Sequence, residues 1–368
     1  MHSRKLLSLF SAILLGGTLE AQDIHFTQFN MNPTTLNPAL SGKFEGTLRL
    51  SGIYRDQYGS VINDKDVQPA IRNKQFKTPA AGVDAPLIRG FRKKDWVGAS
   101  LGFFSDKVGQ GELTHSSFNL GAAYHLALDK KGNAVLSIGA QYGRGQRGVN
   151  PENLRFEDGF GKDGIYIPNL SKESLTNGSG EDITVSYTGI NAGALLSSRL
   201  NKQMDFNLGF AMSHINQPRS GLVDAGGGTT NPGMGGNSGG NSKLPSRISV
   251  HGQFNMQLQP RFSLSPSFLY QTMSGNQEII LQGLANYLFN PEKEITLSFG
   301  VGYRMRDAIH PIVGGKYKNL TVGLAYDVNI SGLSQASNFR GGFELAANYI
   351  IKIYKPAVVK PKVLCPRF

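Results

Sequence analysis

Three histidines stand among hydroxyl side chains in segments where apolar and polar residues alternate. They are His115, with Ser117 two positions on, His125, and His251 with Ser249 two positions before it. A serine hydrolase needs a Ser, a His and an orienting polar residue within hydrogen-bond reach. The G-x-S-x-G pattern occurs as GASLG at 98–102, inside an alternating segment, and as GNSGG at 236–240, inside a glycine-rich run. Neither stands at the strand-to-helix turn that would expose a nucleophile, and scattered Ser and His also suit a wet interior. We therefore predict no catalytic residue.

Metal and cofactor chemistry has little support in the sequence. The seven His are scattered, the single Cys is Cys365, and no ligand spacing typical of zinc occurs. Gly300-Val-Gly302 is too short to indicate a phosphate-binding loop. An acidic cluster could bind Ca²⁺ but lacks the fixed spacing of a calcium loop; it comprises Glu152, Glu157, Asp158 and Asp163. We predict neither a metal nor a cofactor.

Any site in this chain must be positioned by its strands, and residues 320–330 show the strand pattern most clearly. Leu320, Val322, Leu324 and the next alternate residues are apolar, whereas the residues between them are small or polar. Such alternation gives a strand one apolar and one polar face. A tilted strand of about 10 residues crosses a bilayer, so the segment suits a membrane barrel as well as a soluble sandwich.

The same alternation recurs along the chain and predicts an all-β protein. An even number of strands is what bacterial barrels require, and we count about fourteen. Internal prolines in the second and twelfth segments favour bulges or bends there. The predicted strands are 46–58, 75–87, 96–105, 114–127, 134–143, 184–198, 204–215, 247–258, 261–273, 277–289, 294–306, 308–317, 319–331 and 342–353.

The lengths of the connections separate a membrane barrel from a soluble sandwich. Connections after even-numbered strands are short, except the first, 88–95, whereas those of the other parity include the two longest, 144–183 and 217–247. Outer-membrane barrels have short periplasmic turns and long extracellular loops. We therefore predict a transmembrane antiparallel β-barrel in the outer membrane.

Composition and the N-terminus agree with an exported chain. Arg4 and Lys5 precede an apolar run, which predicts a signal peptide cleaved after Ala21. Only 17% of residues are charged and 46 are Gly, which fits small lumen-facing sites. A net charge of +12 could indicate nucleic acid, but an exported chain rarely meets any, so we expect acidic lipid headgroups or an acidic partner instead.

Residues 22–44 combine Pro33 and Pro38 with asparagines and large apolar side chains. Prolines in this arrangement predict neither a regular helix nor a strand. We expect the segment to fold into the barrel mouth as a plug. The predicted organisation is a signal peptide (1–21), an N-terminal plug segment (22–44), an outer-membrane β-barrel (45–354) and a basic, Pro-rich periplasmic tail (355–368).

The run QDIHFTQFNMNPTTLNPALSG, followed by LRLSGIYRDQY, resembles the opening of the PorP/SprF family of outer-membrane proteins associated with type IX secretion and gliding motility. Its main matching residues are His25, Phe26, Gln28, Phe29, Asn32, Pro33, Asn37, Pro38, Tyr54 and Arg55. Later matches are Tyr303-Arg304, Asp307-Ala308, Ala325-Tyr326-Asp327 and Gly341-Gly342-Phe343-Glu344.

This resemblance implies a non-enzymatic barrel that binds a secreted, adhesin-like protein through its type IX C-terminal sorting domain and supports its secretion or surface anchoring. It also implies contact with other components of the secretion or motility apparatus. From the residues alone, a passive porin and a fatty-acid-transporter-like channel with a hatch remain alternatives. We expect outer-membrane lipids as further partners and no nucleic acid. The predicted partner-binding residues, aromatic or apolar beside glycines, are Phe156, Phe160, Tyr166 and Ile167.

Overall fold

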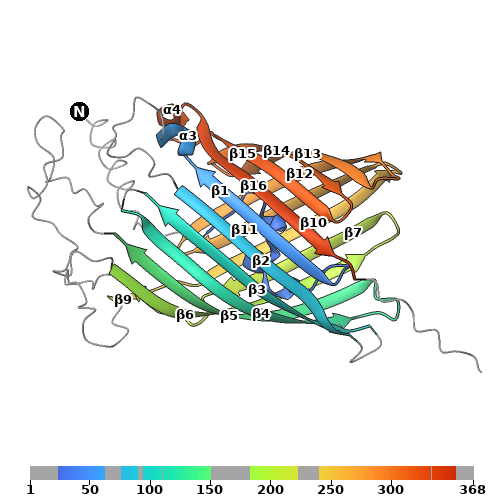
Figure 1. Cartoon of the computed structure of the whole chain (residues 1–368), viewed down its shortest axis with the longest axis horizontal. Coiled ribbons are helices and arrows are strands. Elements are labelled where there is room, and N and C mark those ends of the chain that lie inside the picture. The colour runs from blue at the N-terminus through green and yellow to red at the C-terminus, as the bar shows by residue number, and fades with distance from the viewer. Residues whose placement is uncertain are drawn as a thin grey trace, which may run out of the picture.

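Strands of alternating sequence pair side by side and close on themselves into a barrel of fourteen strands (Figure 1). The first strand, β1 (Leu48–Gln57), bonds antiparallel to the last, β16 (Arg340–Ile351), with Leu48 opposite Ile351. In this computed structural model the described residues are 24–62, 76–89, 94–109, 111–150, 183–222, 240–332 and 334–353. The predicted fold class is confirmed.

The other twelve strands of the barrel follow the order of the chain around the wall. They are β2 (Phe76–Arg89), β3 (Trp96–Val108), β4 (Leu113–Ala127), β5 (Ala134–Val149), β6 (Ile183–Arg199), β7 (Met204–Ser213), β10 (Arg247–Gln259), β11 (Phe262–Met273), β12 (Asn276–Asn290), β13 (Ile295–Arg304), β14 (Ala308–Tyr317) and β15 (Leu320–Asn329).

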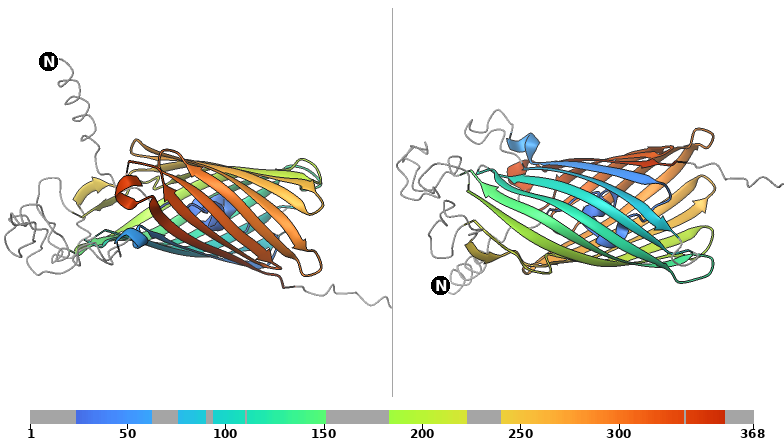
Figure 2. Two further views of the ribbon diagram at one scale, coloured as in Figure 1. Left: turned by 90° about the horizontal axis from the view of Figure 1, so that it is seen from above. Right: turned by 60° about the horizontal axis from the view of Figure 1, so that its bottom comes forward.

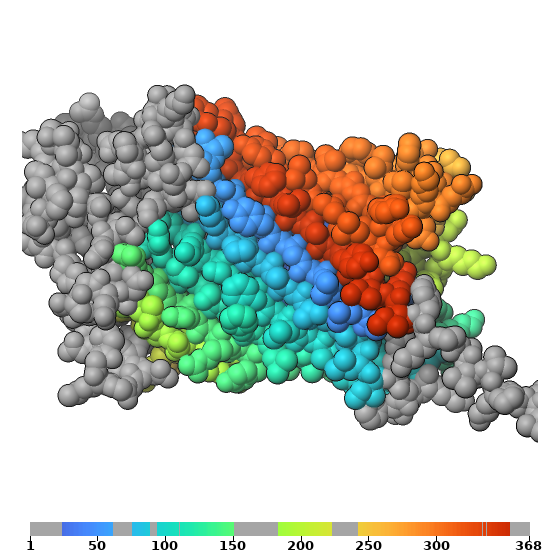
Figure 3. All heavy atoms as spheres, in the orientation of Figure 1, coloured from blue at the N-terminus to red at the C-terminus, as the bar shows by residue number. Residues whose placement is uncertain are grey.

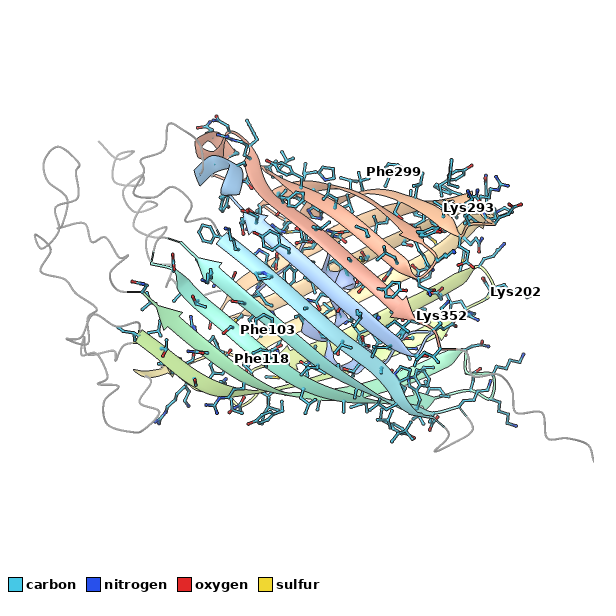
Figure 4. The ribbon with its side chains drawn as sticks, in the orientation of Figure 1. Phe103, Phe118, Lys202, Lys293, Phe299 and Lys352 are labelled. Atoms are coloured by element: carbon cyan, nitrogen blue, oxygen red, sulfur yellow. The ribbon has the colours of Figure 1, made fainter. Side chains whose placement is uncertain are left out.

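Alternation along each strand sorts side chains between the outer surface and the lumen. In β15, Leu324 is 43% exposed on the outside, whereas Asp327 is only 4% exposed on the inside. Phe103, Phe118 and Phe299 likewise project from the outer wall (Figure 4). Side chains fill the spaces between strands on the face drawn in Figure 3. The outer wall therefore offers lipid an apolar surface.

The two ends of the barrel differ in their connections. At the end that we call the short-turn end, hairpins such as 128–133, 200–203 and 291–294 join neighbouring strands. The opposite, long-loop end carries the two longest connections, 150–182 and 214–246. The latter contains a two-stranded sheet of β8 (Arg219–Gly221) and β9 (Gly240–Lys243), which the sequence did not predict.

Strand boundaries depart from prediction mainly at the long-loop end. We predicted that the fifth strand would end at residue 143, but β5 continues to Val149 and pairs with β4 and β6 over that stretch. Its outward Arg144 and Gln146 are exposed, so the polar sequence resembles a loop although its backbone bonds are satisfied within the sheet. A predicted irregularity occurs in β2, where the register shifts between Pro86 and Ile88, whereas no register shift interrupts β14 around Pro311.

The N-terminal segment, residues 24–44, lies inside the barrel rather than only at its mouth (Figure 2). Contrary to our prediction it contains helical turns, each of three or four residues: η1 (Phe29–Met31), α2 (Pro33–Leu36) and η2 (Pro38–Leu40). Pro33 and Pro38 occupy first-turn positions, where a missing N–H costs no hydrogen bond.

Two further short helices, α3 (Gly59–Ile62) and α4 (Ser334–Ser337), lie at the long-loop end. None of the helices in the described part of the chain is long and apolar enough to span a bilayer.

Candidate functional site in the barrel lumen

The N-terminal segment crosses the lumen between two sets of polar contacts. Thr27 and Gln28 contact strand residues near the long-loop end, and we call this set the long-loop anchor. Ser41 and Gly42 contact residues near the opposite end, which we call the short-turn anchor. The segment is therefore held at both ends before the chain enters β1.

In the long-loop anchor, one carboxylate satisfies two consecutive backbone N–H groups. The amides of Thr27 and Gln28 donate to Glu344 of β16 at 2.8 and 2.6 Å. The Gln28 side-chain amide donates to the carbonyl of Gly323 in β15 at 3.4 Å. A Cβ at Gly323 would lie 2.1 Å from the Gln28 side chain, so only glycine leaves room for this contact.

The Thr27 hydroxyl lies at the centre of a buried ion network. It donates to Asp327 at 2.9 Å and accepts from Arg304 at 2.7 Å and Arg55 at 3.3 Å. Both guanidiniums also bond to the other oxygen of Asp327, at 2.9 Å from Arg55 and 3.0 Å from Arg304. All four side chains are almost fully buried, so the network can persist only because its charges oppose one another.

Further groups extend this network around Arg304. Its guanidinium lies 2.9 Å from Asp307 and 3.1 Å from Glu278. The Gln282 amide donates to the backbone carbonyl of Thr27 and lies 3.2 Å from His310. The network thus joins β1, β12, β13, β14 and β15 to one residue of the N-terminal segment.

His25 precedes this network in the chain. Burial lowers its pKa to about 4; nearby Glu278 raises it, whereas Arg55 and Arg304 lower it further. The imidazole is consequently neutral at neutral pH and adds no third cation beside the two guanidiniums.

Apolar side chains of the segment pack on inward residues of the wall between the two anchors. Phe26 joins a cluster with Ile53 and Phe104, and Phe29 packs with Leu269 and Ile280. Each phenyl ring is 4% exposed. Burying a large apolar side chain contributes about 1.5–3 kcal/mol, so expelling the segment from the lumen is costly.

Asn37 uses a gap that two glycines leave in the wall. Its amide nitrogen lies 3.1–3.2 Å from the carbonyls of Ala194 and Phe210 and from Nε2 of His251. A Cβ at Gly193 would be 2.0 Å from the Asn37 side chain, and a Cβ at Gly209 would meet its amide at 2.9 Å. The residue fits because β6 and β7 carry no side chain at these two positions.

The short-turn anchor combines an ion pair with a histidine. Asp84 accepts from the Gly42 amide at 2.7 Å and forms two bonds with Arg49 at 2.8 and 2.9 Å. His125 donates through Nε2 to the Ser41 carbonyl at 2.8 Å. Trp96 stacks on this imidazole and donates to the Gly42 carbonyl at 3.0 Å.

Little space remains between the segment and the wall. Two cavities, which share Ile24, Thr35, Leu36 and Arg247 in their linings, measure about 20 and 30 Å³. A cavity of this size holds about one or two water molecules, whereas an engineered apolar cavity that binds benzene measures about 150 Å³. Leu269 lines one of these cavities, and both Leu269 and Ile280 pack on Phe29, whereas Leu288 of β12 is only half-buried.

The structure brings most of the predicted motif residues together. Of the ten main matches to the family opening, Tyr54 alone faces outward, at 37% exposure. The remaining nine belong to the N-terminal segment or contact it; they are His25, Phe26, Gln28, Phe29, Asn32, Pro33, Asn37, Pro38 and Arg55. The predicted partner-binding residues Phe156, Phe160, Tyr166 and Ile167 lie outside the described residues.

Two of the inward histidines, His125 and His251, contact the segment, whereas His115 contacts the wall. His251 receives a bond from Asn37, and His115 bonds to the Tyr187 hydroxyl. His125 lies 2.7 Å from the Ser137 hydroxyl, but its second nitrogen meets a backbone carbonyl rather than a carboxylate, and its ring is fully buried. Within the described residues no three His, Cys, Asp or Glu side chains gather as metal ligands. The acidic cluster at 152–163 is outside the described residues.

Sequence reasoning did not identify the ion network itself. Arg304, Asp307, Asp327 and Glu344 stand in the later stretches that resemble the family, but no role was assigned to them. The sequence did contain a signal for such a network: charged residues occupy inward positions of predicted membrane strands. A charge buried there requires a partner of opposite charge.

We expect Gly139→Ala to dislodge the segment, because a Cβ there would lie 2.5 Å from the backbone carbonyl of Pro38. Overpacking of this kind costs about 1–3 kcal/mol. Trp96, the sole tryptophan, contacts Gly42 and should then emit at longer wavelength. Gly283→Ala is the matched control, since a Cβ there meets nothing within 4 Å. Identical emission spectra for both variants would refute the proposed fit.

We expect Asp327→Asn to destabilise the protein strongly, because Arg55 and Arg304 would both lose a buried counter-charge. Breaking a buried ion pair costs about 3–5 kcal/mol. The free energy of unfolding, measured by urea titration in lipid vesicles, tests this. Glu292→Gln in an exposed turn is the control and should change it by less than about 0.5 kcal/mol. A loss below about 1 kcal/mol for Asp327→Asn would contradict the interpretation.

Comparison with known proteins provides the family. No curated protein sequence matches the chain. Solved barrels with similar shapes include the toluene transporter TbuX of Ralstonia pickettii (12% identity, 87% of this chain and 93% of that chain covered, TM-score 0.48). A FadL homologue of Pseudomonas aeruginosa is also similar (13% identity, 87% of this chain and 95% of that chain covered, TM-score 0.43).

The family described as "Type IX secretion system membrane protein PorP/SprF" matches residues 18–349. The chain, an outer-membrane β-barrel, therefore belongs to the PorP/SprF family of type IX secretion system membrane proteins.

Proposed function

We propose that this protein is a non-enzymatic anchoring platform of the type IX apparatus, which holds a secreted, adhesin-like protein through its C-terminal sorting domain. The single observation that carries this proposal is the N-terminal segment, which lies in the lumen and is bonded to the wall at two anchors. A barrel built in this way provides a rigid surface rather than a route for solutes. Family membership supplies the secretion apparatus as its context.

The proposed binding surface is the long-loop end, which we orient toward the cell exterior because outer-membrane barrels carry their long loops there. β5 and β6 remain paired as far as Val149 and Ile183, so they present the connection between them from an ordered base. A stable interface needs about 800 Å² on each partner, which a two-residue hairpin does not supply. Only the longer connections offer enough surface.

The alternative of a channel for solutes or hydrophobic molecules requires a vacant path. The lumen cavities of about 20 and 30 Å³ disfavour it, as does the burial of Phe26 and Phe29 against the wall. Opening such a path would require breaking both anchors and exposing both phenyl rings.

The segment in the lumen should block the passage of ions through the barrel. In planar bilayers we expect the intact mature protein to show no steady conductance, and deletion of residues 22–44 to produce open-pore currents. The Gly283→Ala variant is a control that should remain silent, because its Cβ has free space. Steady porin-like conductance from the intact protein would contradict the platform proposal and favour a channel.

The client contact predicts a second phenotype. Aromatic residues contribute strongly to interfaces, so replacing Phe156, Phe160 and Tyr166 with Ser should release the client. The readout is retention on intact cells of a fluorescent protein fused to a type IX C-terminal sorting domain. The matched control replaces three polar residues of the same loop with Ala: Asn169, Ser174 and Asn177.

Both triple variants should still fold, as shown by heat-modifiable migration on a gel. We expect at least about a tenfold loss of retention for the aromatic variant, equivalent to about 1.4 kcal/mol, and little change for the control. Equal retention by both would place the client contact outside these aromatic residues.

A further inference from the structure

Ten exposed basic residues lie around the short-turn end of the barrel. Three that Figure 4 labels, Lys202, Lys293 and Lys352, project at the end opposite the long loops. We call this set the basic ring; its members are Lys94, Lys130, Lys131, Arg199, Lys202, Arg261, Lys293, Lys316, Lys318 and Lys352.

Members of the basic ring stand next to the apolar edge of the outer wall. Tyr317 is 51% exposed and directly precedes Lys318, which lies 5.3 Å over its ring. Leu128 and Leu200 are 53% and 56% exposed, each two positions before a ring lysine. In a bilayer these apolar side chains lie at the boundary of the hydrocarbon, and a lysine just beyond them reaches the headgroup level.

The ring charges are mostly uncompensated within the protein. The ion pairs given above lie in or beside the lumen, and no ion pair of the described residues includes a member of the ring. Acidic residues at this end are fewer than the ten basic ones: Glu45, Asp95, Asp129, Asp205, Glu292 and Glu294. Asp129 already accepts a backbone bond from Ala134 at 3.0 Å. Anionic groups from outside the chain are therefore the natural counter-charges.

The arrangement also indicates what kind of anion fits. The basic residues lie in or beside the connections after β2, β4, β6, β10, β12 and β14 and at the end of β16, and thus surround the barrel. A protein partner would contact one sector of this circumference, whereas lipids surround all of it. Ammonium groups bind phosphate oxygens as point charges with three donors each.

We propose that the basic ring binds the phosphate groups of anionic phospholipids in the leaflet around the short-turn end. This inference is independent of client binding, because it concerns the opposite end of the barrel. Each basic residue near an anionic membrane surface adds to the attraction, which salt screens within a Debye length.

The test compares lipid composition around three proteins reconstituted in vesicles of phosphatidylcholine with a minority of phosphatidylglycerol. The ring variant is Lys130→Gln, Lys202→Gln, Lys293→Gln and Lys318→Gln. The control variant removes equal charge from exposed positions at the long-loop end: Lys107→Gln, Arg219→Gln, Lys243→Gln and Arg306→Gln. Native mass spectrometry of the released proteins reports the ratio of phosphatidylglycerol to phosphatidylcholine that each retains.

We expect the wild type and the control to retain phosphatidylglycerol at least about threefold above its vesicle fraction, and the ring variant to lose most of this enrichment. Heat-modifiable migration verifies that all three are folded. Equal enrichment in all three proteins would overturn the proposal. So would a wild type without enrichment that instead binds a poly-glutamate peptide, because the ring would then serve an acidic protein.

Discussion

A segment that forms only short helical turns inside a closed barrel must find partners for its other backbone amides and carbonyls, because no neighbouring strand pairs with them. An unpartnered polar group away from water costs about 1–3 kcal/mol. Here the partners are side chains of the wall: Glu344 takes two amides, Asp84 takes another, and His125 and Trp96 donate to carbonyls. The inward polar residues of the strands thus supply the hydrogen-bond partners that the backbone of the segment lacks.

Charge balance explains why several strands contribute to one contact. Asp327 alone would be a buried anion, and Arg55 or Arg304 alone a buried cation, each strongly disfavoured. Asp327 pairs with both guanidiniums, and Glu344 beside Arg55 and Glu278 and Asp307 beside Arg304 supply further negative charge. The Thr27 hydroxyl bonds to all three members of the central group. Because the pairs connect β1, β13 and β15, the network fixes the segment and also bridges strands on both sides of the β1–β16 seam.

Glycines supply the other half of the fit. At Gly98 a Cβ would lie 1.9 Å from the carbonyl of Ser41, and at Gly139 it would meet the backbone of Pro38. Strand glycines usually weaken a sheet, but here they leave the depressions into which the segment packs. The abundance of glycine in the sequence predicted small lumen-facing sites, although not which part of the chain fills them.

Alternation was enough to predict the strands because each one separates lipid from lumen, and this separation imposes a period of two. Alternation did not predict residues 144–149 of β5. This part of the strand extends past the lipid-facing surface, where no lipid favours apolar side chains. The turns at Phe29–Met31 and Pro33–Leu36 are too short to show a helical period. The pairing of Thr27 with Glu344 depends on barrel closure, which local pattern does not encode. Family resemblance identified the motif residues without their partners.

The bond between Thr27 and Glu344 joins positions that are 317 residues apart. During synthesis the segment is made first, but its carboxylate partner is made almost last, so the long-loop anchor can form only when β16 is available to close the barrel. Contacts between such distant positions slow folding, because loop-closure entropy must be overcome before they contribute. Until that moment the cluster around Phe26 lacks Ala346 of β16, so part of its apolar surface stays uncovered in the unassembled chain. The long-loop anchor would then form only in a barrel whose last strand is correctly paired.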